Sequence, residues 1–187
     1  MSDTALVLID IQNDYFPGGR MALEGSPEAA AKAAAALAAF RARGLPILHL
    51  RHLSVRPGAT FFLPGSEGAE IHASVRPLPG EPVIEKNFPN SFRGTDLQAQ
   101  LERAGVRHLV VAGMMTHLCV DASVRQANDY GFRVTLLADG CATRPQKFGD
   151  ETVPARQVQV AFLAALNGAY ARVAATAEIL QTLPEST

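Results

Sequence analysis

The sequence predicts an α/β protein with a three-layer Rossmann-like fold, in which a central parallel sheet of about six strands carries helices on both faces. Short apolar runs alternate along the chain with longer helix-like stretches, which is typical of consecutive β–α–β units. Several of these runs are apolar throughout, as expected for strands that are buried on both faces. With 187 residues the chain can bury one core, so we expect residues 1–187 to form a single domain.

Local signals mark the first strand, the first helix and the second strand. Residues 5–9 are short, apolar and partly β-branched, which indicates a buried strand. Ser26, followed by proline and glutamate, predicts the start of a helix, because it combines a capping residue with proline at the first helical position. Gly44 predicts the end of that helix. Residues 45–50 then form the second predicted strand.

The middle of the chain combines a long loop with a third strand and a helix. Residues 53–79 are rich in glycine and proline, and loops of this length in compact domains are often functional. Residues 82–85 are predicted as a strand. Thr95 and Gln98 form a capping-box pattern that predicts the start of a helix, which Gly105 would end. For the remaining residues we expect strands at 106–112, 132–138 and 172–175, helices at 116–130 and 154–170, and a loop at 139–153.

Composition excludes several classes of function. The formal net charge is -1 and the basic residues are scattered, which argues against nucleic-acid binding. No run approaches the roughly 20 apolar residues that cross a bilayer, so we expect no membrane association. The N-terminus lacks the pattern of a signal peptide, and two cysteines do not make a disulfide scaffold. We therefore expect a cytoplasmic protein that binds a small molecule.

Residues with complementary chemistry follow several of the predicted strands. In open parallel sheets, ligands bind beyond the carboxyl ends of the strands. Asp10 follows the first strand, Lys86 the third and Asp139 the fifth, and Cys119 lies shortly after the fourth. The sequence therefore predicts that an acid, a cation and a thiol meet at one edge of the sheet.

These residues suit acyl transfer. Cys119 lies about one turn into a predicted helix, whose N-terminal partial charge favours a thiolate, and Lys86 would add a full positive charge. Asp10 is suited to take up the thiol proton and pass it to a leaving group. The backbone N–H groups of Met115 and Cys119 are candidates for an oxyanion hole. Each residue also has a purely structural alternative: a buried small side chain for the cysteine, a turn residue for the aspartate and a solvated charge for the lysine.

Three motifs in order resemble the isochorismatase-like cysteine hydrolase superfamily. They read LIDIQNDYF at residues 8–16, VIEKNF at 83–88 with SFRGT at 91–95, and AGMMTHLCV at 112–120. The resemblance implies a Rossmann-like fold, a homodimer or higher homo-oligomer, no cofactor, and hydrolysis through the cysteine, lysine and aspartate named above. It also implies a non-proline cis peptide, which we place at Met114–Met115. The GMMTHLCV wording, with CATR at 141–144, is similar to a bacterial subgroup that includes streptothricin-hydrolase-like proteins.

The metal site of the nicotinamidase branch is not expected here. That branch carries an aspartate and two histidines after the second strand, whereas this chain has His49 and His52 there, no nearby aspartate, and His72 further on. Two histidines three apart on a strand point to opposite faces and do not easily share an ion. We therefore predict no metal.

The sequence leaves the substrate open. The retained cysteine favours a small amide, lactam or imide, and the alternatives are the vinyl ether of an isochorismatase, with Arg51, Arg56 or Arg93 as cationic contact, or non-catalytic binding on the same scaffold. A dinucleotide site is excluded because the first turn lacks the glycine-rich phosphate loop. We interpret Cys141 as structural, and Phe61 as another candidate for the pocket. The predicted substrate-binding residues are Gln12, Tyr15, Phe16, Phe62, Phe88, Phe92, Met114 and His117.

Overall fold

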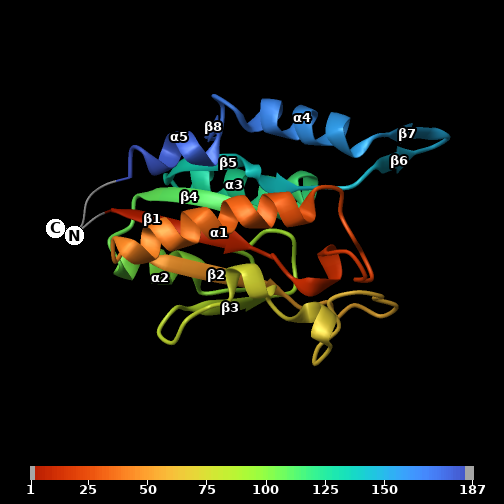
Figure 1. The fold of residues 1–187 in the computed structure, drawn as a ribbon, viewed down its shortest axis with the longest axis horizontal. Helices are drawn as coiled ribbons and strands as arrows, with labels where there is room; N and C mark the ends of the chain where they lie inside the picture. The colour runs from red at the N-terminus through yellow and green to blue at the C-terminus, as the bar shows by residue number, and fades with distance from the viewer. Residues whose placement is uncertain (1–2, 184–187) are drawn as a thin grey trace.

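A computed structural model describes residues 3–183, and its centre is a six-stranded sheet (Figure 1). All neighbouring strands of the sheet pair in parallel, in the order β3-β2-β1-β4-β5-β8. This confirms the predicted fold class. The strands are β1 (Thr4–Ile9), β2 (Ile47–His52), β3 (Val83–Lys86), β4 (His108–Met114), β5 (Arg133–Ala142) and β8 (Arg172–Ala174).

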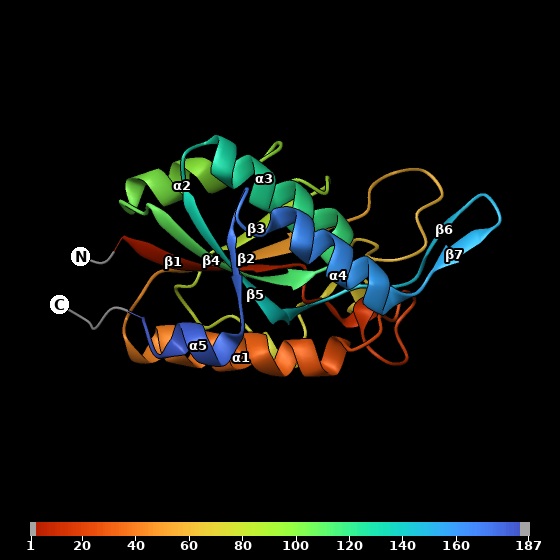
Figure 2. The same cartoon turned by 90° about the horizontal axis from the view of Figure 1, so that it is seen from above.

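Helices cover both faces of the sheet (Figure 2). The helices α1 (Ser26–Ala42) and α5 (Thr176–Leu180) lie on one face. The helices α2 (Leu97–Arg103), α3 (Asp121–Asp129) and α4 (Ala155–Leu166) lie on the other. An apolar cluster lies between each helix layer and the sheet, because alternate residues of the buried strands point to opposite faces. Within residues 3–183, no helix is long and apolar enough to cross a membrane.

The strand β1 lies at the point where the sheet order reverses. The chain first adds strands on one side of β1, as β2 and β3, and then on the other side, as β4, β5 and β8. Such a switch point leaves a crevice at the carboxyl ends of the two central strands, where ligands bind in doubly wound sheets. Asp10 follows β1 directly, and Cys119 lies shortly beyond the end of the neighbouring strand β4.

Two predicted helix caps form differently. Ser26 does not cap α1: its hydroxyl donates to the Leu23 carbonyl, and Gly25 precedes the helix with a φ of 73°. The capping box is also absent, because α2 begins only at Leu97 and the Gln98 side chain donates to Glu102 within the helix.

Other differences concern the second half of the chain. The predicted helix at 116–130 is divided into a π-helical turn at Thr116–Val120 and α3. The predicted loop at 139–153 holds the end of β5 and the hairpin of β6 (Gln146–Phe148) and β7 (Glu151–Val153), which extends away from the sheet (Figures 1 and 2). The sequence Ala-Asp-Gly at 138–140 is typical of a turn, but β5 continues through it, and its register against β4 shifts there. The helix α5 was not predicted.

The long loop after β2 is held in place by one buried carboxylate. Asp14 belongs to a short 3-10 turn (Asn13–Tyr15), and its two oxygens accept from the backbone N–H groups of Arg20 and Phe62. A Cβ on Gly68 would lie 2.2 Å from the same carboxylate, so the loop approaches it too closely for any side chain. These contacts place Phe62 in a left-handed conformation, φ 54°, over the carboxyl end of the sheet.

Candidate active site

Asp10 is fully buried at the carboxyl end of β1, in a conformation that few residues adopt. Its φ is 52°, in the left-handed region that aspartate tolerates better than most side chains. Its Oδ2 lies 2.7 Å from the Lys86 Nζ. The Cys119 thiol also hydrogen-bonds to this carboxylate. A buried carboxylate that accepts from a thiol is placed to take up the thiol proton.

Lys86 is a buried ammonium at the end of β3. Besides the ion pair with Asp10, its Nζ lies 3.1 Å from the Phe88 carbonyl, 3.3 Å from the Pro89 carbonyl and 3.3 Å from His52 Nδ1. Burial alone lowers the pKa of Lys86, but the negative charge of Asp10, helped by the interaction with Cys119, outweighs it and raises the pKa above its ordinary value. The side chain is therefore a fixed positive charge.

Cys119 lies in the π-helical turn that follows β4 and is 3% exposed. Its sulfur, a carboxylate oxygen of Asp10 and a ring nitrogen of His52 lie within 4.8 Å of one another. Burial, and then the charge of Asp10, raise the pKa of the Cys119 thiol well above its ordinary value, although Lys86 opposes them. The expected thiolate is therefore not the resting form; the thiol is protonated near neutral pH.

The charges explain this difference from the sequence prediction. A protonated thiol leaves Asp10 and Lys86 as a neutral pair, whereas a thiolate would place a net negative charge in a buried site. Transfer of the thiol proton to Asp10 keeps the net charge of the three groups at zero. The arrangement therefore favours a thiol that loses its proton to Asp10 only as it attacks.

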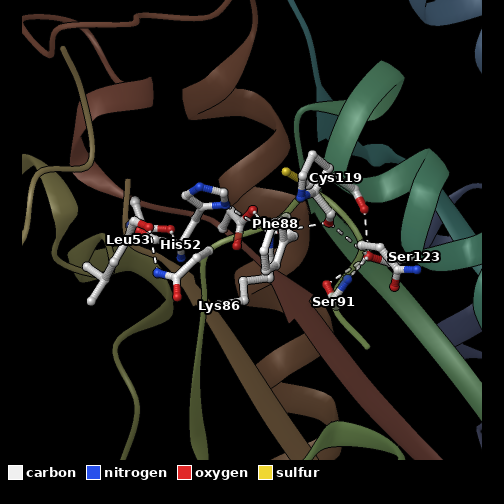
Figure 3. Close-up of polar contacts among 12 residues, drawn as sticks. His52, Leu53, Lys86, Phe88, Ser91, Cys119 and Ser123 are labelled. Atoms are coloured by element: carbon white, nitrogen blue, oxygen red, sulfur yellow. Dashed lines mark hydrogen bonds and ion pairs between the residues drawn. The ribbon is translucent and has the colours of Figure 1, made fainter. Parts of the chain in front are cut away.

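Ser123 connects the nucleophile to the loop that surrounds the ammonium (Figure 3). Its Oγ lies 2.6 Å from the Cys119 carbonyl and 2.7 Å from Ser91 Oγ, and it accepts from the Ser91 N–H at 3.0 Å. Both serines are buried. Since the Phe88 and Pro89 carbonyls that contact Lys86 belong to the same loop, this network fixes the cation relative to the thiol. The sequence analysis did not identify either serine.

A cavity of about 250 Å³ opens above the thiol. Its walls are mainly aromatic and apolar, with a few polar side chains, as in most small-molecule sites. Of the predicted residues, Tyr15, Phe61, Phe62, Phe88 and Cys119 line it. Burial raises the pKa of the Tyr15 phenol well above its ordinary value, so this wall presents a neutral hydroxyl. The other lining residues are Arg56, one of the three arginines considered from sequence as a cationic contact, and five residues not assigned to the pocket from sequence: His52, Ser54, Asn87, Pro89 and Leu118.

Five predicted substrate-binding residues lie elsewhere. Phe16 stacks on His72 at 3.6 Å between ring centroids. Met114 is completely buried in the core, and Phe92 packs against other aromatic rings under α3. His117 bonds to Thr143 away from the cavity.

The fifth, Gln12, acts on the site indirectly. It is buried, and its amide holds both backbone groups of His52, accepting from the N–H at 2.8 Å and donating to the carbonyl at 2.9 Å. Its Nε2 also donates to the Ala69 carbonyl. Gln12 therefore fixes the point where the chain leaves β2, rather than contacting a substrate.

The three histidines considered as metal ligands do not gather. His49 is buried against Glu81, 3.0 Å away, on the far side of β2, and His72 lies in the loop against Phe16. Of these three, His52 alone reaches the cluster of Asp10, Lys86 and Cys119. Asp10, His52 and Cys119 are chemically suited to a transition metal, but the Lys86 ammonium already pairs with the carboxylate at 2.7 Å.

The backbone between β4 and Cys119 has the predicted cis peptide bond. The Met114–Met115 peptide bond is cis. Gly113 precedes it with a φ of 153°, and a Cβ there would lie 2.2 Å from the Ile9 carbonyl oxygen, so only glycine fits between β1 and β4. The N–H groups of Leu118 and Val120 donate to the Met115 carbonyl. The oxyanion role of the Met115 and Cys119 N–H groups stays a prediction.

A comparison with protein families agrees with this geometry. A family model described as the isochorismatase domain matches residues 4–178. The chain belongs to the isochorismatase family. A solved isochorismatase-hydrolase structure from Oleispira antarctica is 46% identical, with a TM-score of 0.92 over 97% of this chain and 99% of that one.

Relatives in the isochorismatase family include hydrolases of several kinds. The family protein YddQ of Bacillus subtilis is 51% identical over 95% of this chain and 99% of its own length. A streptothricin hydrolase of Streptomyces noursei is 37% identical over 74% of this chain, and the match spans 49% of that protein. The ureidoacrylate amidohydrolase RutB of Variovorax paradoxus is 26% identical over 74% of this chain and 68% of its own. The predicted family and the hydrolase class are thus confirmed.

Proposed function

We propose that this hydrolase cleaves the C–N bond of a small amide through a covalent thioester on Cys119. The observation that supports this most directly is the position of the Cys119 thiol, which hydrogen-bonds to the buried Asp10 carboxylate and lies within 4.8 Å of it. Lys86 holds the carboxylate in place and supplies a fixed positive charge. These are the three groups that nucleophilic acyl transfer needs: a nucleophile, a proton carrier and an electrostatic stabiliser.

In the first half of the reaction, the thiol proton of Cys119 moves to Asp10 as the sulfur bonds to the amide carbonyl carbon. The π electrons of the carbonyl move to its oxygen, and the Lys86 ammonium offsets that negative charge. Asp10 then donates the proton to the amide nitrogen, the C–N bond breaks, and the amine leaves. The enzyme is left with a thioester and an ionised Asp10.

In the second half, water adds to the thioester while Asp10 accepts a proton from it. The C–S bond breaks, the carboxylic acid departs, and the proton returns from Asp10 to the sulfur. The sum is amide plus water giving acid plus amine, with every group restored. Asp10 therefore serves as base and as acid in alternation. The Lys86 ammonium stays beside it in both protonation states.

The size of the cavity limits the substrate. A volume of about 250 Å³ equals that of roughly eight water molecules at about 30 Å³ each. An acyl group of around ten non-hydrogen atoms or fewer fits this space, and anything larger must extend through the mouth. Small amides, open-chain or cyclic, therefore suit the site better than bulky ones. The relative named as an amidohydrolase supports the same bond type.

A panel of small primary amides, cyclic amides and imides tests the proposal by release of ammonia or ring-opened acid. We expect turnover of open-chain amides by the natural enzyme and none by Cys119→Ser, with Cys141→Ala as the matched control that retains activity. Cys141 is suitable because it is buried in β5, away from the cavity. Turnover of a vinyl ether that survives Cys119→Ser would instead identify the isochorismatase type of reaction.

A further inference from the structure

One wall of the cavity is made by alternate residues of the segment that leaves β2. His52, Ser54 and Arg56 all line the cavity. The residues between them face elsewhere: Leu53 packs against the apolar core and Val55 is 61% exposed. Alternation of this kind is the signature of extended backbone, in which every second side chain points the same way. Two backbone hydrogen bonds fix the segment: the Leu53 N–H donates to the Lys86 carbonyl, and the Ser54 N–H donates to the Phe62 carbonyl.

All three residues of this wall present hydrogen-bond donors. His52 Nδ1 lies 3.3 Å from the Lys86 ammonium, which can only donate, so Nδ1 accepts and the ring proton is on Nε2. Burial lowers the pKa of His52 to about 4; the charge of Asp10 opposes this shift and those of Lys86 and Arg56 add to it, so the ring is neutral near pH 7. Among residues 3–183, no acceptor contacts His52 Nε2, Ser54 Oγ or the Arg56 guanidinium.

This wall of the cavity carries positive charge and no negative charge. No aspartate or glutamate is among the described residues that line it, and Asp10 below the thiol is already paired with Lys86. Arg56 has no ion-pair partner within the part of the chain that the structure describes. A neutral N–H, a hydroxyl and an unpaired guanidinium in a row match the two oxygens and the charge of a carboxylate.

We infer that His52, Ser54 and Arg56 form a carboxylate subsite, so that the substrate is a small amide that also carries a carboxylate, as succinamate does. The inference rests on the proposed function for its substrate class, but the subsite itself can be tested without turnover. A ring nitrogen of His52 lies within 4.8 Å of the Cys119 sulfur, so the bound carboxylate lies only a few bonds from the scissile carbonyl.

The alkylating reagents iodoacetate and iodoacetamide provide the test, because they are nearly isosteric and differ in the carboxylate. The rate of modification of Cys119 by each reagent is measured at pH 9 by peptide mass, and the iodoacetate-to-iodoacetamide ratio is compared with that of N-acetylcysteine. We expect the ratio at Cys119 to exceed that of the free thiol by roughly tenfold, which corresponds to about 1.4 kcal/mol. Ratios equal to that of the free thiol would overturn the inference.

Variants assign the effect to the wall. Arg56→Met should return the ratio most of the way to that of the free thiol, and Ser54→Ala should lower it by a smaller factor. Arg103→Met, which removes the same charge from an exposed position on α2, is the matched control and should leave the ratio unchanged. An equal fall in Arg56→Met and Arg103→Met would mean a general effect of net charge and would contradict a built subsite.

A second measurement covers the case in which the buried thiol reacts with neither reagent. The ring signals of the five histidines are followed by ¹H–¹⁵N correlation spectroscopy during titration with propionate and, separately, propionamide. Propionate should shift the His52 signals in the natural protein but not in Arg56→Met. Equal responses to the two compounds, or none, would overturn the subsite. Because neither readout needs catalysis, failure of the amide screen alone would refute the proposed function and the amide class of the substrate, and it would leave the carboxylate subsite standing.

Discussion

Replacing Asp10 with asparagine should make the Cys119 thiol more reactive towards alkylation while it abolishes turnover. The two effects have one cause. The carboxylate opposes ionisation of the thiol and is one of the causes of its raised pKa, yet it is also the group that carries the proton through the reaction. The asparagine amide is nearly isosteric with the carboxylate, and Lys86 would keep its contacts with the Phe88 and Pro89 carbonyls.

The distance between the groups sets the magnitude. The Asp10 oxygen and the Cys119 sulfur lie within 4.8 Å of each other. At that distance two negative unit charges repel each other by about 3.5 kcal/mol at an effective dielectric constant of about 20. Removal of that repulsion raises the thiolate fraction at fixed pH by roughly 300-fold. A less basic thiolate is also a weaker nucleophile, with a Brønsted coefficient of about 0.4–0.5, so the net gain in alkylation rate is roughly 20- to 30-fold.

The assay is the rate of Cys119 carbamidomethylation between pH 6 and 10, measured on the natural protein and the variant. Asp121→Asn is the matched control, because it removes an equal charge from α3 where Asp121 is paired with Arg125, and it should change the rate little. An Asp10→Asn protein that is alkylated at the natural rate or more slowly would refute the charge argument. Retained amide turnover in that variant would refute the proton-carrier role.

Buried contacts lead to three further predictions. Lys86→Met leaves the buried Asp10 carboxylate without its partner and should lower the free energy of unfolding by about 3–5 kcal/mol, measured by urea denaturation at pH 7. Gly113→Ala places a Cβ 2.2 Å from the Ile9 oxygen and should cost more than about 3 kcal/mol, visible as a large fall in Tm. His52 has a native pKa of about 4, below the roughly 6.5 of an unfolded histidine, so stability should fall as pH drops from 6.5 to 4, and His52→Gln should flatten that dependence.

Each of these predictions has a control within the chain. Lys147→Met removes an exposed cation from β6 and should leave the free energy of unfolding within about 0.5 kcal/mol of the natural value. Gly18 has a φ of 89°, but no atom lies within 4 Å of a Cβ added there. Gly18→Ala therefore measures the cost of the backbone conformation alone, without the steric clash that Gly113→Ala adds. His108→Gln, another histidine with a lowered pKa, should remove a smaller part of the pH dependence than His52→Gln. Equal effects of test and control would contradict the stated causes.

The fold, and the meeting of Asp10, Lys86 and Cys119 at one edge of the sheet, could be predicted because both depend on short-range pattern. Uninterrupted apolar runs identify strands buried on both faces, and a charged residue directly after such a strand must lie at the edge of the sheet. Asp10 and Lys86 therefore follow from position alone. The homo-oligomeric state and the cytoplasmic location, by contrast, stay predictions that rest on resemblance and composition.

The walls of the cavity depended on tertiary contacts that no local pattern records. Phe16 and Phe62 have similar sequence surroundings, but only Phe62 is held over the thiol, through the Asp14 carboxylate. Of the polar wall, only Arg56 was a candidate from sequence, because the alternation of His52, Ser54 and Arg56 continues beyond β2 into a loop. The raised pKa of Cys119 could not be derived from the helix terminus and Lys86, which favour a thiolate, because the burial of a thiol depends on the whole fold.

The central claim is that an acyl group passes through Cys119, and rapid acid quench during turnover of a small carboxylated amide tests it most directly. Peptide mass spectrometry should find the acyl mass on the peptide that contains Cys119, and hydroxylamine should remove it as the hydroxamate. The peptide that contains Cys141 should carry no such mass. Ammonia release by the natural enzyme with no acyl mass on Cys119, and with undiminished release after Cys119→Ser, would contradict the thioester mechanism.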